Sequence, residues 1–430
     1  MQVPKSLFIG TYSPLKIVKD IHHPSSIIHQ LSTMGLREYK KNIQLFYGSS
    51  ILTGLIGVFA PIIVIFQTNE IGIPLGQVLV IEGLFALTVM LFEIPSGIFA
   101  DRFSRRTTLL FGSLTAALGI FIFGISQNIW HVLTSQMIMG IGLAARSGAD
   151  QAIIYDSLKA LKQTHSYPKL LADFKAIEYG SAILATACGG LLAAYFGLRT
   201  PILVSSAMFF LVTVTWFFLS EPPRAKLHER STFLDYGKKG FALIGQTPFL
   251  LWLVVFTALI TAGLKINFHT LNPLWEANEV PLAWFGFILA AYNGMAMITS
   301  LILPRILKTL GAMKALMVIW MMVSAGFGVM AVLKLGIWGA IAFPIIFQVA
   351  RAFMMIVPND LLQKNTESDT RATVISMKSF TNTLSQTVCL FIFGLITESF
   401  SFFSGFGFLA VLFLFGGGVG LYKMYVAVKK

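Results

Sequence analysis

Long apolar runs repeat along almost the whole chain, and they restrict its fold more than any other feature. A helix needs about 20 mainly apolar residues to cross the hydrocarbon core of a bilayer. Twelve runs of roughly that length follow one another, separated by polar turns. Because a bilayer core holds no water to satisfy backbone groups, such runs must fold as helices. The sequence therefore predicts an all-α membrane protein.

The predicted transmembrane segments account for most of the chain. Composition agrees with them, since 56% of the 430 residues are hydrophobic and only 12% are charged. A soluble protein of that composition would expose large apolar patches. Cys188 and Cys389 lie inside predicted segments without metal-site or disulfide spacing, so we interpret both as packing residues. The twelve segments are residues 43–67, 75–100, 107–125, 130–157, 173–197, 201–220, 247–272, 282–304, 313–333, 337–360, 372–397 and 402–426.

The positions of Lys and Arg predict the orientation of these segments, because cationic loops stay on the cytoplasmic side during insertion. Twenty-five lie in the two terminal regions and in every second loop, whereas only Arg199 and Lys334 lie in the other loops. Both termini are therefore predicted to be cytosolic, and no cleaved signal peptide is expected. The net charge of +13 then reflects topology, not nucleic-acid binding.

The longest internal connection divides the segments into two sets of six. A shift of 204 residues places Asp156 on Asp360 and Gly190 on Gly394, a weak echo of the repeat that such halves often share. We predict two pseudo-symmetric six-helix bundles. The predicted parts are a cytosolic N-terminal tail (1–42), an N-terminal bundle (43–220), a cytosolic linker (221–246) and a C-terminal bundle (247–430).

One short motif lies between the second and third segments. It reads Gly97-Ile-Phe-Ala-Asp101-Arg102-Phe-Ser104-Arg105-Arg106. This stretch resembles the loop signature of the major facilitator superfamily, Gly-x-Leu-x-Asp-Arg-x-Gly-Arg-Arg/Lys, with serine in place of the second glycine. Its position after the second of twelve segments is the one the family requires. The resemblance implies a secondary transporter in which two six-helix halves rock around a central site.

We interpret the motif as a conformational latch on the cytoplasmic side. Gly97 would let helices approach closely, and Asp101 would face the positive N-terminal end of a helix in the other half. Arg102, Arg105 and Arg106 complete the motif. The alternative is that the acid and the arginines only solvate a loop.

A second latch contact is predicted deeper in the membrane. Glu93 and Lys378 each lie about two turns from the cytoplasmic surface, in the second and eleventh segments. An ion pair between them would close the cytoplasmic side and favour the outward-open state. The alternative is that Lys378 reaches toward lipid headgroups while Glu93 pairs elsewhere.

Two other family patterns are altered. Proton-coupled members tend to carry arginine four residues before the glycine of the fourth helix, but this chain has Gln136 before Gly140. The glycine-proline pattern that drug exporters carry in the fifth helix is also missing, with Ala185 and Thr186 at those positions. Both departures weaken an interpretation as a drug exporter.

Basic residues within the predicted segments indicate the substrate. A charge at bilayer depth needs a partner, a wet cavity or a function. Because the first, fourth, seventh and tenth helices line the cavity in the facilitator fold, we predict that Arg146 and Arg351 bind the oxygens of an organic anion, aided by Lys265 and His269. Alternatively, Arg146 only pairs with Asp150 one turn away, and His269 is a satisfied polar residue.

Buried acids are the candidates for coupling transport to a proton gradient. They are Glu82, Asp150 and Glu178, the last with Lys175 one turn away. No nucleophile elbow, phosphate-binding glycine loop or metal-ligand cluster is present in the sequence, so we expect neither an enzyme nor a cofactor or metal.

The sequence thus predicts a proton-coupled secondary transporter of a small organic anion. Its expected partners are the solute, membrane lipids and a proton or other coupling ion, without nucleic acid and as a monomer in a bacterial-type inner membrane. Two alternatives stay open. One is an efflux pump for drugs or amphiphiles, and the other is a transport-dead sensor or lipid translocator with the same fold.

Overall fold

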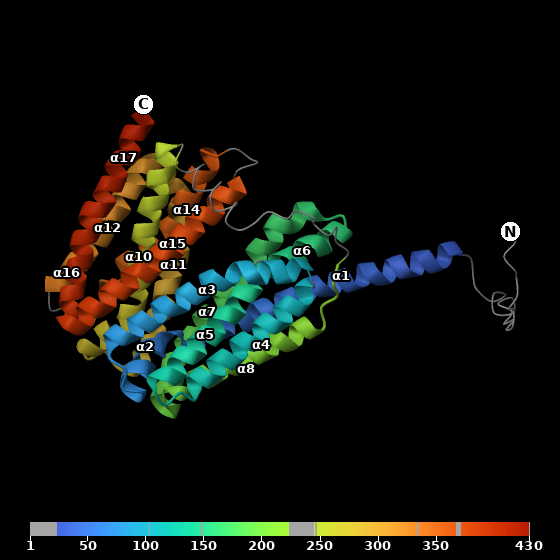
Figure 1. Cartoon of the computed structure of the whole chain (residues 1–430), viewed down its shortest axis with the longest axis horizontal. Helices are drawn as coiled ribbons and strands as arrows, with labels where there is room; N and C mark the ends of the chain where they lie inside the picture. Colours follow the sequence, from blue (N-terminus) through green and yellow to red (C-terminus); the bar gives the residue numbers. More distant parts are fainter. Residues whose placement is uncertain are drawn as a thin grey trace, which may run out of the picture.

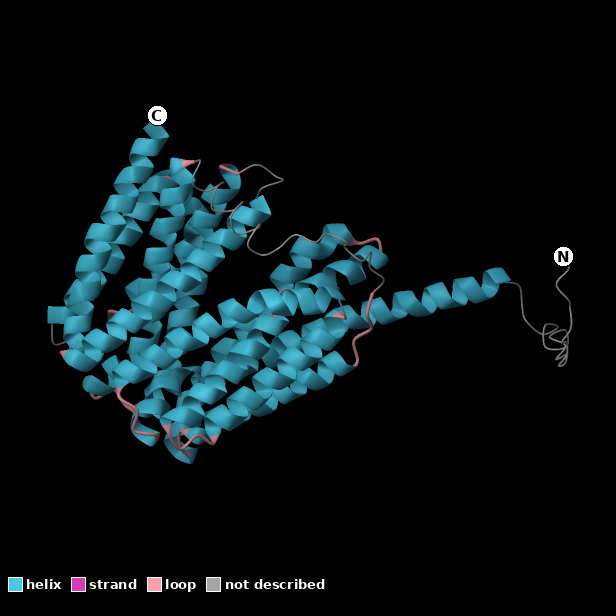
Figure 2. Ribbon diagram, in the orientation of Figure 1, coloured by secondary structure: helices cyan, strands magenta, loops and turns pink. Residues whose placement is uncertain are grey.

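The apolar runs form long helices joined by short loops, as Figure 2 shows for this computed structural model. The structure describes residues 24–102, 104–147, 149–222, 245, 247–332, 335–366 and 371–429. Within these ranges every regular element is a helix, which confirms the predicted all-α fold class.

The first half of the chain contributes the elements up to residue 217. They are α1 (Pro24–Leu55), η1 (Ile56–Ile62), α2 (Ile63–Ile65), η2 (Phe66–Glu70), α3 (Leu75–Arg102), α4 (Arg105–Gly124), α5 (Ile129–Arg146), α6 (Ala149–Ala160), η3 (Thr164–Ser166), α7 (Tyr167–Phe196) and α8 (Arg199–Phe217). The helix α1 begins well before the predicted first segment. Residues 24–42, which were predicted as part of the N-terminal tail, form the first part of α1.

The second half contributes the remaining elements. They are α10 (Pro248–Ala277), α11 (Leu282–Leu310), α12 (Ala312–Val332), α13 (Gly336–Ala342), α14 (Ile345–Lys364), α15 (Arg371–Ser399), α16 (Phe402–Leu412), η4 (Phe413–Gly417) and α17 (Gly418–Lys429). Residues 223–244 of the predicted linker lie outside the described residues.

Eleven helical stretches among the described residues are long and apolar enough to cross a membrane. They match eleven of the predicted segments. The predicted fourth segment, residues 130–157, is occupied by α5 and α6, which are not among the eleven. The count of twelve therefore stays a prediction.

The expectation of one continuous fourth helix is wrong. The helix α5 ends at Arg146, Ser147 leaves the helical region with ψ of 121°, and α6 starts at Ala149. Serine followed by Gly148 explains the break, because both residues are poor helix formers and such pairs often interrupt helices. Arg146 and Asp150 consequently do not share one helical face.

The two halves meet at one end of the molecule and diverge toward the other, as Figure 1 shows. The first described residues of α1 and the last of α17 lie at the diverging end, together with the basic loops. We call this end the basic end and the opposite one, where the halves meet, the far end. By the charge distribution, the far end is predicted to be extracellular.

Glycines make the contacts between halves at the far end. On one side α3 packs on α15, where a Cβ added to Gly76 would lie 2.6 Å from the carbonyl oxygen of Gly394. On the other side α7 packs on α11, where a Cβ on Gly190 would lie 2.7 Å from the backbone nitrogen of Gly286. Only residues without a side chain allow backbones to approach so closely. Gly190 and Gly394, equivalent under the 204-residue shift, occupy corresponding crossings.

Candidate functional site

A cluster of buried polar side chains lies where the two halves meet, near the far end. At its centre is Glu82 of α3, whose side chain is 3% exposed. The amide nitrogen of Gln136 from α5 donates to Glu82 Oε1 at 2.8 Å. Across the interface, His269 Nε2 of α10 lies 3.6 Å from Glu82 Oε2. Lys265, one turn before His269, interacts electrostatically with Glu82, and Gln67 of η2 is a further polar neighbour of Glu82.

This cluster combines residues for which separate roles were predicted. Lys265 and His269 were expected to bind substrate, whereas Glu82 was expected to couple a proton; the structure brings the three together. Lys265 and His269 share one face of α10, because i and i+4 positions lie on the same side of a helix. Both ring nitrogens of His269 lack a hydrogen-bond partner, although the residue is 1% exposed. An acid and an unsatisfied imidazole thus face each other across the boundary between the halves.

Arg351 lies in the middle of α14 and faces the first half. Its Nη2 donates to Asn293 Oδ1 of α11 at 2.9 Å, and it interacts electrostatically with Tyr179 of α7. Among the described residues no carboxylate lies within ion-pair distance of this guanidinium. A neutral amide holds Arg351 in place, which leaves its charge available to an anion.

Arg146 has a different environment from the one predicted. Its guanidinium lies 5.2 Å from the ring centroid of Phe209 on α8, within the first half, and its Nε has no hydrogen-bond partner. The predicted partner Asp150 is not within ion-pair distance and instead accepts a hydrogen bond from the backbone of Gln151 at 2.6 Å. The helix break separates the two residues. Arg146 is held by cation–π packing and long-range attraction to Asp150 and Glu178.

The other predicted coupling acids stay within the first half. Glu178 accepts from Lys175 at 2.7 Å, the neighbour expected from the sequence. Asp150 interacts electrostatically with Arg146, Lys175 and Glu178, all from the same half. Of the three candidate acids, Glu82 contacts a titratable side chain of the opposite half.

The predicted ion pair between Glu93 and Lys378 is absent from this structure. Glu93 is exposed and accepts a hydrogen bond from Ser147 Oγ at 3.1 Å, whereas Lys378 donates to Asn359 Oδ1 of α14. A Cβ on Gly97 would meet no atom within 4 Å, so the close helix contact expected there is also missing. Both differences have one cause, because the halves diverge at this end. The pair stays a prediction for a state in which the basic end is closed.

The loop motif instead ties together helices of the first half. Ser104 caps the start of α4 by accepting from Thr107, and Arg105 forms an ion pair with Asp156 of α6. Arg106 donates to the carbonyl of Phe217 at the end of α8. The side chains of Asp101 and Arg102 lie outside the described residues, so their predicted latch role stays a prediction.

Glu221 completes this anchor and was not predicted. Its carboxylate accepts from Ser104 Oγ at 2.8 Å and from the backbone nitrogens of Arg105 at 3.0 Å and Arg106 at 2.8 Å. A carboxylate at a helix N-terminus satisfies free N–H groups and the helix dipole together. The sequence signal was a lone acid just after the sixth segment, next to a basic loop.

We expect Glu221→Ala to lower the thermal unfolding midpoint of the purified protein by several degrees, since charge-assisted hydrogen bonds contribute roughly 1.5 to 3 kcal/mol each when buried and less when partly exposed. Glu221→Gln should recover part of the loss, because the amide oxygen still accepts. Glu279→Ala, at an exposed acid of the α10–α11 turn, serves as the control. An unfolding midpoint unchanged by Glu221→Ala would contradict the anchor.

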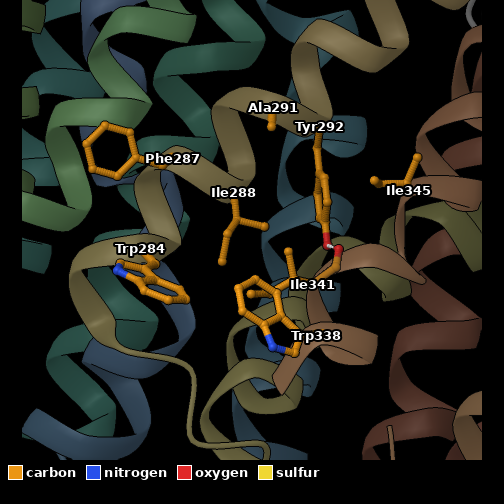
Figure 3. A pocket seen from close by; sticks show the side chains of 8 residues that line it. All are labelled: Trp284, Phe287, Ile288, Ala291, Tyr292, Trp338, Ile341 and Ile345. Carbon is orange, nitrogen blue, oxygen red and sulfur yellow. Dashed lines mark hydrogen bonds between the residues drawn. The ribbon is translucent and has the colours of Figure 1, made fainter. Parts of the chain in front are cut away.

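An apolar groove of about 400 Å³ opens on the surface between α11 and the α13–α14 pair. Figure 3 shows the aromatic rings of Trp284, Phe287 and Trp338 along it. Trp338 is 72% exposed, whereas the hydroxyl of Tyr292 is satisfied by the carbonyl of Ile341 at 2.6 Å. The groove therefore offers apolar and aromatic contacts with no free polar group at its base.

Two helical bundles that meet around a buried polar cluster form a multi-pass integral membrane protein. The chain belongs to the Major Facilitator Superfamily, whose family profile matches residues 45–388. Several relatives and structural neighbours are named as transporters.

Among curated relatives, the uncharacterized MFS-type transporter YfiS of Bacillus subtilis is 29% identical over 188 residues, which cover 41% of this chain and 42% of that protein. Multidrug resistance protein MdtG of Yersinia enterocolitica is 27% identical over 283 residues, which cover 63% of this chain and 65% of that protein. The chain thus matches about half the length of such relatives. The crystal structure of nucleoside transporter NupG superposes with a TM-score of 0.73 at 14% identity, covering 90% of this chain and 98% of that one, and shows the shared fold.

Proposed function

We propose that this chain is a proton-coupled secondary transporter that carries a small organic anion by alternating access. The observation that carries the proposal is Glu82, a buried carboxyl that contacts its own half through Gln136 and the opposite half through His269. A proton that binds or leaves there changes the attraction between the two halves. Proton binding and the rocking of the halves are then linked at one residue.

The arrangement of the halves supports alternating access. Gly76 and Gly394 bring two backbones into contact at the far end. At the basic end, the hydrogen bonds of Glu93 and Lys378 with described residues stay within their own halves. This is the geometry of a transporter closed on the far side. With the predicted orientation it corresponds to the inward-open state.

The charges near the interface support an anionic substrate. Arg351 is bonded to a neutral amide, so a planar guanidinium is available for two-point recognition of a carboxylate or phosphate. Lys265 of α10, which interacts electrostatically with Glu82, is the second candidate group for the anion. We place substrate binding at Arg351 and Lys265, and we assign Arg146 a supporting role inside the first half.

Proton coupling is tested with Glu82→Gln. The amide still fits beside Gln136 but cannot ionise, so we expect uphill uptake driven by a pH gradient to fall at least tenfold while downhill exchange persists. The measurement uses proteoliposomes with an internal pH-sensitive dye and organic anions selected by a binding screen of carboxylates and phosphate esters. Asp360→Asn, at an exposed acid paired with Lys364, is the control. Undiminished gradient-driven uptake by Glu82→Gln would refute coupling through Glu82.

A second candidate function is the export of amphiphiles. It is supported by the relatives named multidrug resistance protein and by the apolar groove along Trp284 and Trp338. Overexpression that raises resistance to lipophilic cations, together with a binding screen in which no anion binds, would favour this function. A chain that moves neither class would instead fit the sensor or lipid-translocator alternative.

A further inference from the structure

The first membrane-crossing helix is irregular close to the far end. Pro61 has no backbone N–H, the stretch Ile56–Ile62 forms a tight 3-10 helix, and Ile62 adopts φ of −127° with ψ of 5°. The regular ladder of backbone hydrogen bonds is interrupted there. Buried backbone groups left without partners are costly in a membrane protein, so something else must bond them.

A side chain from the other half supplies the missing partners. Asn272 of α10 donates from Nδ2 to the carbonyl oxygen of Pro61 at 2.8 Å, and its Oδ1 accepts from the backbone nitrogen of Val64 at 3.2 Å. Asn272 is 4% exposed. One amide thus donates to and accepts from the backbone of the interrupted helix, across the boundary between halves.

Neighbouring residues on α10 make weaker contacts with the first half. Three residues before Asn272, His269 lies 3.6 Å from Glu82, beyond hydrogen-bond distance. Four residues after it, Glu276 accepts from Asn69 at 2.6 Å, in an exposed position. Water can replace an exposed bond at little cost, whereas a buried pair of bonds has to be broken before water enters. Asn272 therefore carries a buried pair of hydrogen bonds on this helix face that must break when the far end opens.

We propose that Asn272 is a gating residue, whose two hydrogen bonds to the first helix hold the far end closed and set the ratio of inward-open to outward-open molecules. The proposal rests on alternating access but not on the substrate or on proton coupling. Opening would leave Pro61 and Val64 to be bonded by cavity water. Loss of the Asn272 amide makes the closed state less favourable, while the open state is hardly affected.

The test measures the two states directly, without substrate. Spin labels are placed on a Cys188→Ala, Cys389→Ala background at Gln127→Cys and Ser399→Cys, which are exposed positions at the far ends of the two halves. Pulsed electron–electron double resonance on the full chain in lipid nanodiscs then gives the distribution of distances between the two spin labels. For Asn272→Ala we expect the long-distance, outward-open population to rise about tenfold relative to the closed one. Asn272→Leu keeps the volume without the bonds and should shift the ratio similarly.

The matched control is Asn278→Ala on the turn after α10, where the amide bonds only to the carbonyl of Leu274. It should leave the distance distribution unchanged. A second label pair, at Lys159→Cys and Lys308→Cys of the basic end, should shorten as the far-end pair lengthens. If both Asn272 variants keep the wild-type distribution, or if Asn278→Ala shifts it equally, the gating role is wrong. If the Glu82→Gln experiment refutes proton coupling, the gating role of Asn272 is unaffected, because its test uses neither substrate nor a proton gradient.

Discussion

Gly286→Ala is expected to lower transport at least tenfold, the largest effect we predict for a single methyl group. A Cβ at this position of α11 would lie 2.3 Å from the carbonyl oxygen of Thr186 and 2.7 Å from that of Ala187. Both are backbone atoms of α7, which cannot move aside as a flexible side chain can. The halves must separate at the far end, so the closed state becomes inaccessible and the transport cycle stops.

The matched control lies on the same helix. Gly294→Ala makes the same chemical change two turns further along α11, where an added Cβ meets no atom within 4 Å. Initial transport rates in proteoliposomes, with equal amounts of reconstituted protein, compare the two variants. In Gly286→Ala, the distance distribution of the spin-label pair at positions 127 and 399 should also shift toward long distances. Wild-type transport by Gly286→Ala would contradict the role of this crossing.

Arg351→Ala is expected to weaken binding of an anionic substrate by about tenfold to a hundredfold, the loss expected for one or two hydrogen bonds to a charged group. Arg351→Lys should recover only part of the affinity, because an ammonium group cannot reproduce planar two-point contact. Calorimetry or thermal-shift titration with the anion from the screen measures both variants.

Arg305→Ala at the exposed basic end of α11 controls for the general loss of one positive charge. Asn293→Ala adds a second check, since it frees Arg351 from its neutral partner without removing the charge. It should change affinity less than Arg351→Ala does. An affinity unchanged in Arg351→Ala would rule out this residue as the anion site and favour the export of amphiphiles.

Much of the architecture could be predicted from the sequence because the bilayer imposes it. The length of the apolar runs determined where the helices lie, and eleven helical stretches of the structure match predicted segments. The fourth segment shows the limit of that argument, since hydropathy could not reveal that Ser147 interrupts a helix between Arg146 and Ala149. Local backbone preference decided the break there, and the alternative of a direct ion pair between Arg146 and Asp150 on one helical face is not seen in this structure.

The candidate site could be predicted only in part. An ionisable residue in an apolar run needs a partner, a wet cavity or a function, and that rule selected Glu82, Lys265 and His269 as candidates. Nothing in the sequence indicated that the three would meet, because α3 and α10 belong to different halves. Polar residues without charge, such as Asn272 and Asn293, carry the contacts between helices but give too weak a signal in a single sequence.

By itself the sequence determined an all-α membrane protein with the loop motif of its family, because the length and composition of each run depend on the solvent, not on neighbouring helices. Only the tertiary structure decided which residues face one another across the two halves. It placed His269 beside Glu82, tied Asn272 to Pro61, and left Glu93 and Lys378 apart at the diverging end. Such contacts depend on how two rigid bundles pack in one state of a moving protein. A pattern along a single chain does not record that packing, because the partners lie between 187 and 285 residues apart in the sequence.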